Sequence, residues 1–455
     1  MPSFLQRAAR YAAILFLVAT VVHPRLVLAQ HAIDDDFVRW ATAHAIPTGS
    51  VEMADPLDDL RMLSSIVGSA RVVALGEPTH GMHEPLAFRN RLFRYLVEEM
   101  GFSAIALESA LPESRRLAEL VAGGPGAPPI ADAPAIVRQS FTWGFGNFGE
   151  NLELVRWMRA YNDEPAHRRK IRLYGIDLSL GGPLGSSPTT ASLDGALSYL
   201  AHVDSSAARR ARGRFAPYVS RLPGDASSGF TRAELDGLSA AIDSLAAQLE
   251  ERRATYIAAS TEAEYAWAQR DAEVARQGVQ MLRVQVAPQP RGGIPPAAWR
   301  VIAARDSAMA ENVRWALARE GPTGRLLVFA HDVHVKNAPT VGGIWSVLER
   351  PPTVMGQYLR RALGAQLLII GTSDGSPPDG NSDATSVDAA LARVAVPRFI
   401  IDLRAADRDT AASAWLATQR KLRANGGTFV TLAPGQAFDL LWYAGPLTPA
   451  HRNAP

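Results

Sequence analysis

Cysteine is absent from the 455-residue sequence. Its absence excludes disulfide bonds, lipid attachment through an N-terminal cysteine, and thiolate ligands for a metal. A long apolar run near the N-terminus is also lacking, because the apolar stretch of residues 11–22 is only twelve residues long. A helix that spans a bilayer needs about 20 apolar residues. The stretch is therefore more typical of the core of an export signal than of a membrane anchor.

The flanks of this stretch fit an export signal. Arg7 and Arg10 precede it, and the small residues of 27–29 provide a cleavage site. We expect residues 1–29 to be a cleaved signal peptide, with an uncleaved anchor as the alternative. The mature protein is then exported, to the periplasm, with no stable membrane association.

A clear excess of positive or of negative charge is likewise missing. The whole chain has 47 basic and 45 acidic residues, and without residues 1–29 the numbers are 44 and 45. This balance argues against a basic surface for nucleic acid. The remaining residues exceed the roughly 250–300 that one hydrophobic core usually organises, so we expect a main domain and a second unit.

Buried strands alternate with helices along most of the chain. Short β-branched runs predict strands at residues 71–76, 103–107, 171–176, 325–330, 366–370, 399–403, 428–432 and 438–443. Helical periodicity predicts helices at residues 34–47, 56–67, 84–100, 150–162, 297–319, 355–363 and 409–424. This alternation predicts an α/β fold, a mostly parallel doubly wound sheet with helices on both faces. The catalytic core is expected in two parts, residues 30–180 and 297–455.

The pattern changes between residues 181 and 296. Thr231 and Glu234 form a capping box, and apolar residues then recur at spacings of three and four, the pattern of a paired helix. A second helix is expected over residues 261–286. We therefore predict a helical insert, bounded by Gly and Pro clusters, that forms a wall or lid of the cleft or acts as a buttress.

Polar residues gather where predicted strands end. The stretch from residue 71 to 85 reads RVVALGEPTHGMHEP, a buried strand followed at once by two carboxylates and two imidazoles. In an open parallel sheet the carboxyl ends of the strands form the ligand site. Six residues lie at the ends of four strands, namely Glu77, His80, Glu108, Asp177, His331 and His334. We expect the fold to bring them together.

A neutral imidazole beside a carboxylate is suited to general base catalysis, because the carboxylate fixes the tautomer and raises the basicity. Further imidazoles or an arginine can stabilise an oxyanion. Ester hydrolysis by an activated water needs only these parts. Taken singly, Asp177 can instead cap a helix, and His83 can be a surface residue of the next helix.

Three other chemistries have partial support. Gly371 to Gly375 matches the G-x-S-x-G elbow of serine esterases around Ser373, although Pro377 and Pro378 oppose the helix that must follow. The His-x-x-His pairs at 80 and 331 offer metal ligands without matching a zinc protease pattern. A non-catalytic protein that holds a metal or haem through His331 or His334 is the alternative from another class. The G-x-G-x-x-G match at residues 144–149 lacks a preceding strand, so it does not predict dinucleotide binding.

The sequence resembles the erythromycin esterase family. The resemblance begins with G-E-x-x-H-G-x-x-E at residues 76–84 and with Arg89 in the next helix. It continues, in order, through Gly101–Glu108, Trp157–Asn162, Tyr174–Asp177, Arg305–Asn312, Ala330–Val335, Met355–Gly356 and Phe438–Asp439. The helical insert also stands in the family's usual place.

The resemblance implies a metal-independent hydrolase that opens macrolide lactones, a resistance activity, without a cofactor. His80 would then be the general base, and Glu77 and Glu108 would hold His80 and the water. Binding or polarising the ester would fall to Arg89, His331 and His334, and we add Asp177 to the candidate substrate-binding residues. Two departures are Pro85, where phenylalanine is common, and Asp332, where asparagine is common. The extra charge of Asp332 is expected to raise the pKa of His331.

Overall fold

The computed structural model describes residues 34–178, 188–222, 229–285, 298–375, 383–425 and 428–453. The predicted signal peptide and most of the predicted borders of the insert lie outside these residues. No helix within the described ranges combines the length and the apolar character needed to cross a bilayer. The predicted signal peptide therefore stays a prediction.

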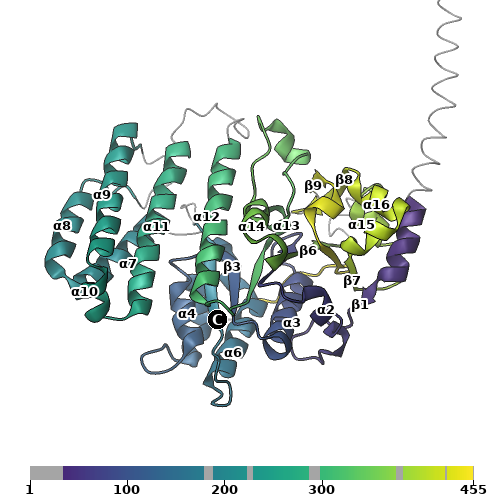
Figure 1. The fold of residues 1–455 in the computed structure, drawn as a ribbon, viewed down its shortest axis with the longest axis horizontal. Coiled ribbons are helices and arrows are strands. Elements are labelled where there is room, and N and C mark those ends of the chain that lie inside the picture. The colour runs from purple at the N-terminus through teal and green to yellow at the C-terminus, as the bar shows by residue number, and fades with distance from the viewer. Residues whose placement is uncertain are drawn as a thin grey trace, which may run out of the picture.

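Eight strands form one sheet in the order β1-β7-β10-β6-β2-β5-β3-β4 (Figure 1). All neighbours from β10 to β4 pair in parallel, whereas β7 runs antiparallel to both β1 and β10. In sheet order the strands are Ile46–Pro47, Phe399–Asp402, Leu440–Tyr443, Leu367–Ser373, Val72–Glu77, Leu326–His331, Ala104–Ala110 and Arg172–Asp177. The prediction of a mostly parallel sheet is confirmed.

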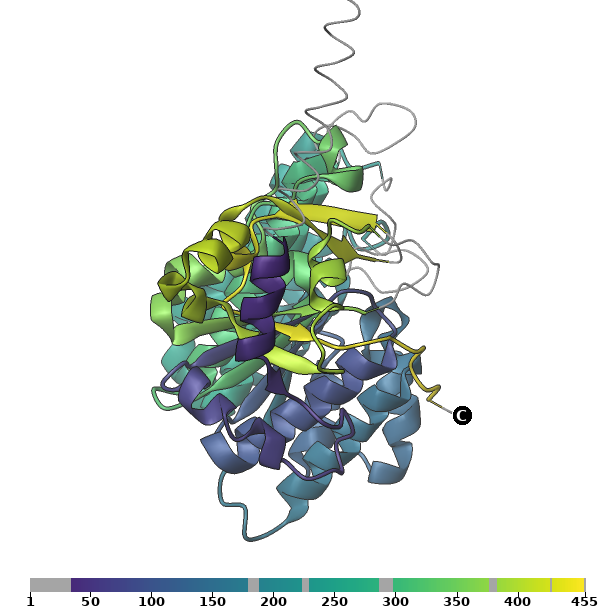
Figure 2. The ribbon, with the colours of Figure 1, turned by 90° about the vertical axis from the view of Figure 1, so that its right-hand side faces the viewer.

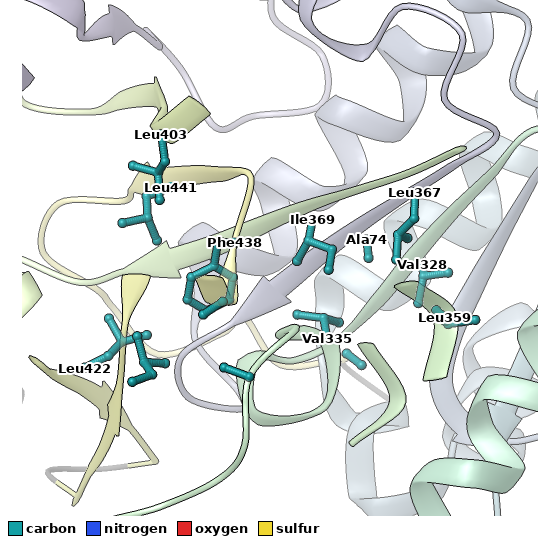
Figure 3. Packing of buried hydrophobic residues seen from close by; sticks show 14 of the residues in the cluster. Ala74, Val328, Val335, Leu359, Leu367, Ile369, Leu403, Leu422, Phe438 and Leu441 are labelled. Carbon is teal, nitrogen blue, oxygen red and sulfur yellow. The ribbon is translucent and has the colours of Figure 1, made fainter. Parts of the chain in front are cut away.

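Helices cover both faces because every central strand is apolar on both sides. In β2, Val72 and Ala74 belong to one hydrophobic cluster and Val73 and Leu75 to the other. On the first face lie a helix over residues 34–44 and the helices α12 (Trp299–Arg319), α14 (Met355–Leu363), α15 (Val387–Leu391) and α16 (Thr410–Ala417). Figure 3 shows this packing, with Ala74, Val328 and Ile369 of the strands beside Val335 and Leu359.

The second face is covered by α2 (Leu63–Val67), α3 (His83–Met100), α4 (Arg115–Ala122), α5 (Ala133–Ser140) and α6 (Gly149–Asp163). Segments far apart in sequence meet at the sheet edge, where the Phe37 ring stacks on Trp415 with centroids 3.5 Å apart. Figure 2 shows the N-terminal helix, in purple, beside the yellow C-terminal elements. The chain from both ends thus completes one core.

The helices between residues 188 and 285 have a hydrophobic cluster of their own. They are α7 (Pro188–Val203), α8 (Ser205–Phe215), α9 (Arg232–Glu251), α10 (Arg253–Ala258) and α11 (Glu262–Gln285). The predicted capping box is present, since Thr231 Oγ1 accepts from the Glu234 N–H and Glu234 Oε2 accepts from the Thr231 N–H. In Figure 1 these helices stand at one end of the molecule, and α11 packs against α12.

The C-terminal region differs from the prediction. The helix expected over residues 409–424 ends at Ala417, and β8 (Arg420–Ala424) follows it. This strand pairs antiparallel with β9 (Thr428–Leu432) in a separate two-stranded sheet. Asn425, which directly follows β8, adopts a positive φ of 46°, a left-handed conformation that asparagine accepts more readily than most residues. The expected helix at 56–67 is likewise shorter, a 3-10 turn (Asp58–Leu60) and then α2.

Candidate active site

A cavity of about 520 Å³ opens at the carboxyl ends of β2, β3 and β5. Its polar lining consists of His80, Glu108, Arg305, His331, His334, Thr340 and Asn425. Its apolar lining consists of Trp143, Phe145, Phe148, Val301, Ile302, Val333, Trp345 and Val354. The mixture of an aromatic wall and a few converging polar groups is typical of a small-molecule site.

A larger cavity of about 740 Å³ lies elsewhere, between α4, β4 and the insert. Its wall contains His202, and no described carboxylate hydrogen-bonds this imidazole. The smaller cavity, in contrast, holds three of the predicted histidines and one of the predicted carboxylates. We therefore place the candidate active site there.

Glu77 and His80 form the predicted imidazole–carboxylate pair. Glu77 ends β2 and is buried, whereas the His80 side chain is 32% exposed. The His80 Nδ1 atom lies 2.7 Å from Glu77 Oε1. Because a carboxylate accepts, Nδ1 carries the proton and Nε2 is left as the basic nitrogen. Burial lowers the pKa of His80, but the Glu77 charge and hydrogen bond outweigh it and raise this pKa overall.

Close packing explains the glycine before Glu77. A Cβ atom at Gly76 would lie 1.9 Å from Asp332 Oδ1 and 2.9 Å from Val335 Cγ2. The strand of His80 and the short helix α13 (Asp332–Val335) therefore touch at this position. A larger residue at this position would overlap α13.

Glu108 of β3 links two other strand ends, those of β5 and β4, to the site. Its Oε2 accepts from the His331 backbone N–H at 2.7 Å, and its Oε1 accepts from Arg305 Nη2 at 2.8 Å. Burial raises the pKa of Glu108, but His334 and Arg305 outweigh this effect and hold the pKa well below its usual range. Glu108 is thus a fixed negative charge in the cavity wall.

His331 presents a hydrogen-bond donor to the cavity. Its Nδ1 accepts from the Val333 backbone N–H at 3.1 Å, so the proton of the neutral ring is on Nε2. Within the described part of the chain, Nε2 is buried and makes no hydrogen bond of normal geometry; the Asn425 side chain lies beside it. The rings of His331 and His80 are 5.0 Å apart.

The pKa of His331 is well below its usual value, because the ring is buried and the neighbouring His80 opposes a second positive charge. The expectation that Asp332 raises this pKa is wrong. Asp332 is itself fully buried, which raises its own pKa well above the usual value, and its carboxylate accepts from the Thr372 N–H. Asp332 therefore anchors α13 to β6 and leaves His331 neutral.

His334 is held by Asp306, whose Oδ1 lies 2.9 Å from the His334 Nδ1. Its Nε2 lies 3.4 Å from Glu108 Oε1 and 3.0 Å from Arg305 Nη1. Burial lowers the pKa of His334, but Asp306 and Glu108 raise it to about 9 overall. At neutral pH the ring is then protonated and forms an ion pair with the Glu108 carboxylate; in the neutral ring, Nε2 accepts from Arg305 Nη1.

Two predicted substrate-binding residues lie outside the cavity lining. Asp177 is fully buried, and its two oxygens accept from Arg305 Nε at 2.8 Å and Nη2 at 2.6 Å. Arg89 is also buried, and its guanidinium donates to the Asn90 side chain at 2.6 and 3.0 Å. Asp177 therefore supports the site from behind by holding Arg305, and Arg89 lies in the wall of a smaller cavity beneath it.

A second, small cavity of about 20 Å³ lies beneath the first, with Glu77, Arg89 and Glu108 in its wall. This is room for one water molecule. Glu77 Oε2 is buried without a hydrogen-bond partner among the described residues. Glu108 borders both cavities, so this small space lies between the two predicted acids and next to the catalytic cavity.

The alternative chemistries receive little support from the geometry. Ser373 is fully buried, donates to Asp388 at 2.7 Å and is absent from the cavity lining. His83 does not join His80 but contacts Glu150 and Glu52 instead, so the two do not share a metal. The glycine-rich stretch forms a 3-10 segment (Thr142–Asn147) whose aromatic rings line the cavity.

Sequence reasoning gave no role to several residues of the site. Arg305 bridges Glu108 and Asp177, and Asp306 beside it holds His334. Both belong to one of the collinear motifs, which was the available signal. Trp143, at a positive φ of 62°, donates from Nε1 to Asp177 at 2.9 Å. This strained conformation has no signature in the sequence.

The sequence model of the erythromycin esterase family matches residues 97–443. The chain belongs to the erythromycin esterase family. The match begins after the loop of His80, so the placement of that loop rests on the structure. Family membership supports a hydrolase of the esterase type that acts on a small molecule.

Two curated relatives from Escherichia coli are named erythromycin esterase type II and type I. They are 30% identical over 146 residues and 34% identical over 121 residues, which is 32% and 27% of this chain and of each relative. A putative hydrolase of Bacillus subtilis is 37% identical over 75 residues, 16% of each chain. The matched stretches thus span about a third or less of the relatives.

Solved structures extend the similarity over nearly the whole fold. A Bacillus cereus protein has a TM-score of 0.74 at 26% identity, covering 92% of this chain and 98% of that one. The structure of a protein named succinoglycan biosynthesis protein has a TM-score of 0.74 at 22% identity, covering 92% of this chain and 99% of that one. An erythromycin esterase mutant in its open conformation has a TM-score of 0.65 at 18% identity, covering 88% and 97%. At 22% and 18% identity, the last two similarities show a shared fold with this chain.

Proposed function

We propose that this chain is an exported esterase that opens an ester or macrolactone with a water molecule activated by His80. The observation that carries the proposal is the pairing of Glu77 with His80, whose ring lines one cavity with that of His331 at a centroid distance of 5.0 Å. A base and an oxyanion donor at this separation can act on the two ends of one ester group.

The first step is proton transfer from water to His80. Glu77 keeps the proton on Nδ1, so the lone pair of Nε2 is available for the water. As the water proton moves to Nε2, the oxygen attacks the carbonyl carbon and the carbonyl π pair moves to its oxygen. The Glu77 carboxylate stabilises the imidazolium that forms.

The second requirement is stabilisation of the oxyanion. His331 offers its Nε2–H from a rigid, buried ring, and the positive charges of Arg305 and His334 lie in the same cavity wall. Such fixed donors stabilise a transition state by roughly 3–4 kcal/mol each in known enzymes. When the intermediate collapses, the C–O bond breaks and the alkoxide takes the proton from His80.

The substrate class follows from the cavity wall. Its aromatic and aliphatic lining, with few polar groups, suits an apolar ring such as a lactone. Two curated relatives carry erythromycin esterase in their names. A macrolide is therefore the first substrate to test, and simple aryl esters are the second.

The decisive experiment compares His80→Ala with wild type on a panel of macrolides and aryl esters. We expect the variant to fold and to lose at least about 10²-fold in kcat, as for removal of a general base. A mass gain of one water, labelled in ¹⁸O-water, identifies hydrolysis. His202→Ala, at an exposed histidine of the insert, is the control.

Retention of wild-type turnover in folded His80→Ala would exclude the proposed base. We also propose that the reaction needs no metal, so turnover is expected to survive treatment with EDTA. Loss of turnover with EDTA and recovery with a metal would contradict that part alone.

Export is tested separately. Cell fractionation followed by mass measurement of the intact protein is expected to find a chain that begins after residue 29 in the periplasmic fraction. A full-length chain in the cytoplasmic fraction would contradict this proposal without affecting the chemistry.

A further inference from the structure

The last residues of the chain lie against the loop that contains His80. The His83 N–H donates to the Thr448 carbonyl at 2.8 Å, and the Ala450 N–H donates to the Gly81 carbonyl at 2.9 Å. On the other side, the Gly149 N–H donates to the His451 carbonyl at 2.7 Å. Residues 448–451 thus connect the start of α3 with the start of α6.

Three side chains converge at this junction. Glu150 Oε1 lies 2.7 Å from His83 Nδ1 and 3.2 Å from His451 Nδ1. The ligand atoms of the three residues all lie within 4.8 Å of one another. They come from three segments of the chain, and none of them lines the catalytic cavity.

The two oxygens of the Glu150 carboxylate differ in their hydrogen bonding. Its Oε1 also accepts from the His451 backbone N–H at 2.9 Å, whereas its Oε2 is buried without a partner among the described residues. The Glu150 side chain is 3% exposed. A buried carboxylate oxygen without a partner is costly, and a cation beside the carboxylate removes that cost.

We propose that His83, Glu150 and His451 bind a divalent transition-metal ion, with Zn²⁺ as the best match. Two imidazole nitrogens and one carboxylate oxygen are a common protein ligand set for zinc, with a further position for water. Both histidines bind through Nδ1, the nitrogen that faces Glu150.

The second nitrogen of His83 supports this assignment. Its Nε2 lies 3.0 Å from Glu52 Oε1, so an Nε2–H there donates to the carboxylate. A metal-bound histidine that donates its other N–H to a carboxylate is the usual outer-shell arrangement of zinc sites. The protein thus supplies the ligands and also a group that orients one of them.

The expected consequence is structural. A metal ion at this place links the C-terminal segment to the helix that begins three residues after His80. Binding to the folded state alone stabilises it by mass action, so Zn²⁺ is expected to raise the Tm.

The test uses tag-free protein freed of metal with EDTA and titrated with ZnCl2 by calorimetry. Wild type is expected to bind one Zn²⁺ per chain and to show a higher Tm with the metal. His451→Ala is expected to weaken binding by at least about 10-fold and to abolish the rise in Tm. The His451 side chain is 72% exposed, so this variant is expected to fold.

His80→Ala serves as the matched control and is expected to bind Zn²⁺ as wild type does. Glu52→Gln is expected to weaken binding without abolishing it. The proposal is overturned if wild type binds no Zn²⁺, if His451→Ala binds as well as wild type, or if His80→Ala is the variant that loses the metal. The last result would place the ion in the catalytic cavity.

Discussion

At the scale of single residues, the three imidazoles of the site differ in their pKa values and therefore in their charge. The pKa of His80 is raised by Glu77 against the effect of burial, that of His331 is lowered by burial, and that of His334 is raised to about 9 by Asp306 and Glu108. One ring is thus a base, one a neutral donor and one a cation. The same residue type takes three roles because its neighbours differ.

Glu77→Gln tests the role of the first pair. A base must be neutral to act, so kcat/KM of wild type is expected to rise with pH through the pKa of His80 and then level off. Without the carboxylate this pKa falls, so the rise is expected at lower pH, and the plateau is expected to drop by about 10- to 10²-fold. Stopped-flow or steady-state pH profiles measure both.

The variant Glu98→Gln provides the comparison, because Glu98 is an exposed residue of α3 that pairs with Arg94 on the same helix. An unchanged pH profile in Glu77→Gln would contradict the assignment of His80 as the base held by Glu77.

At the scale of elements, the site depends on strand ends that touch the helices next to them. Gly76 in β2 has no room for a side chain because α13 packs on it, and Asp332 of α13 accepts from the backbone of β6. Arg305 of α12 reaches across to β3 and β4. The positions of the catalytic groups are therefore set by packing between elements.

Gly76→Ala tests this dependence. The new methyl group would overlap Asp332 and Val335, and such overpacking costs about 1–3 kcal/mol. We expect the free energy of unfolding, measured in urea, to fall by this amount. We also expect a decrease in kcat that is larger, as a fraction, than the change in KM.

Gly213→Ala in α8 is the matched control. Among the described residues, no heavy atom outside its chain neighbours and the backbone of its own helix lies within 4 Å of a Cβ built there. Alanine also favours a helix, so stability is expected to stay equal or rise. Equal stability of Gly76→Ala and wild type would show that the contact between β2 and α13 adjusts freely.

At the scale of the whole molecule, the insert joins the core through α11, which packs against α12. Its described helices contribute no residue to the lining of that cavity, whereas α12 contributes three. The expectation that the insert forms a wall of the cleft therefore does not hold for these helices. The junction instead contains a half-buried ion pair, in which Arg115 of α4 lies 3.2 Å from the buried Asp271 of α11.

The junction predicts a dependence of stability on pH. Burial raises the pKa of Asp271 to about 7, with Arg115 opposing it. The folded state therefore holds a proton that the unfolded state releases near pH 4, and stability from this group falls as the pH rises from about 4 to 7. Asp271→Asn removes that dependence. We expect the difference in unfolding free energy, variant minus wild type, to increase over this range and then stay constant.

Urea titrations at several pH values measure the difference, with Asp243→Asn, an exposed acid of α9, as the control. A difference that does not vary with pH would contradict the raised pKa of Asp271.

Local sequence patterns were sufficient for the alternation of strands and helices, the capped helix of the insert, and the presence of Glu77, His80, Glu108 and His331 at strand ends. These features depend on residues close together in the chain, where hydrophobic runs and turn residues act directly. The resemblance in ordered motifs pointed to the family for the same reason.

Only the tertiary structure decided which polar groups meet. Arg305 lies 197 residues from Glu108 and 128 from Asp177, yet it holds both carboxylates, and Arg89, expected at the substrate, lies buried beneath the site. His83 likewise faces the C-terminal segment and not its neighbour His80. Periodicity shows which face of an element is apolar, but the partner of a buried charge is set by how distant elements pack.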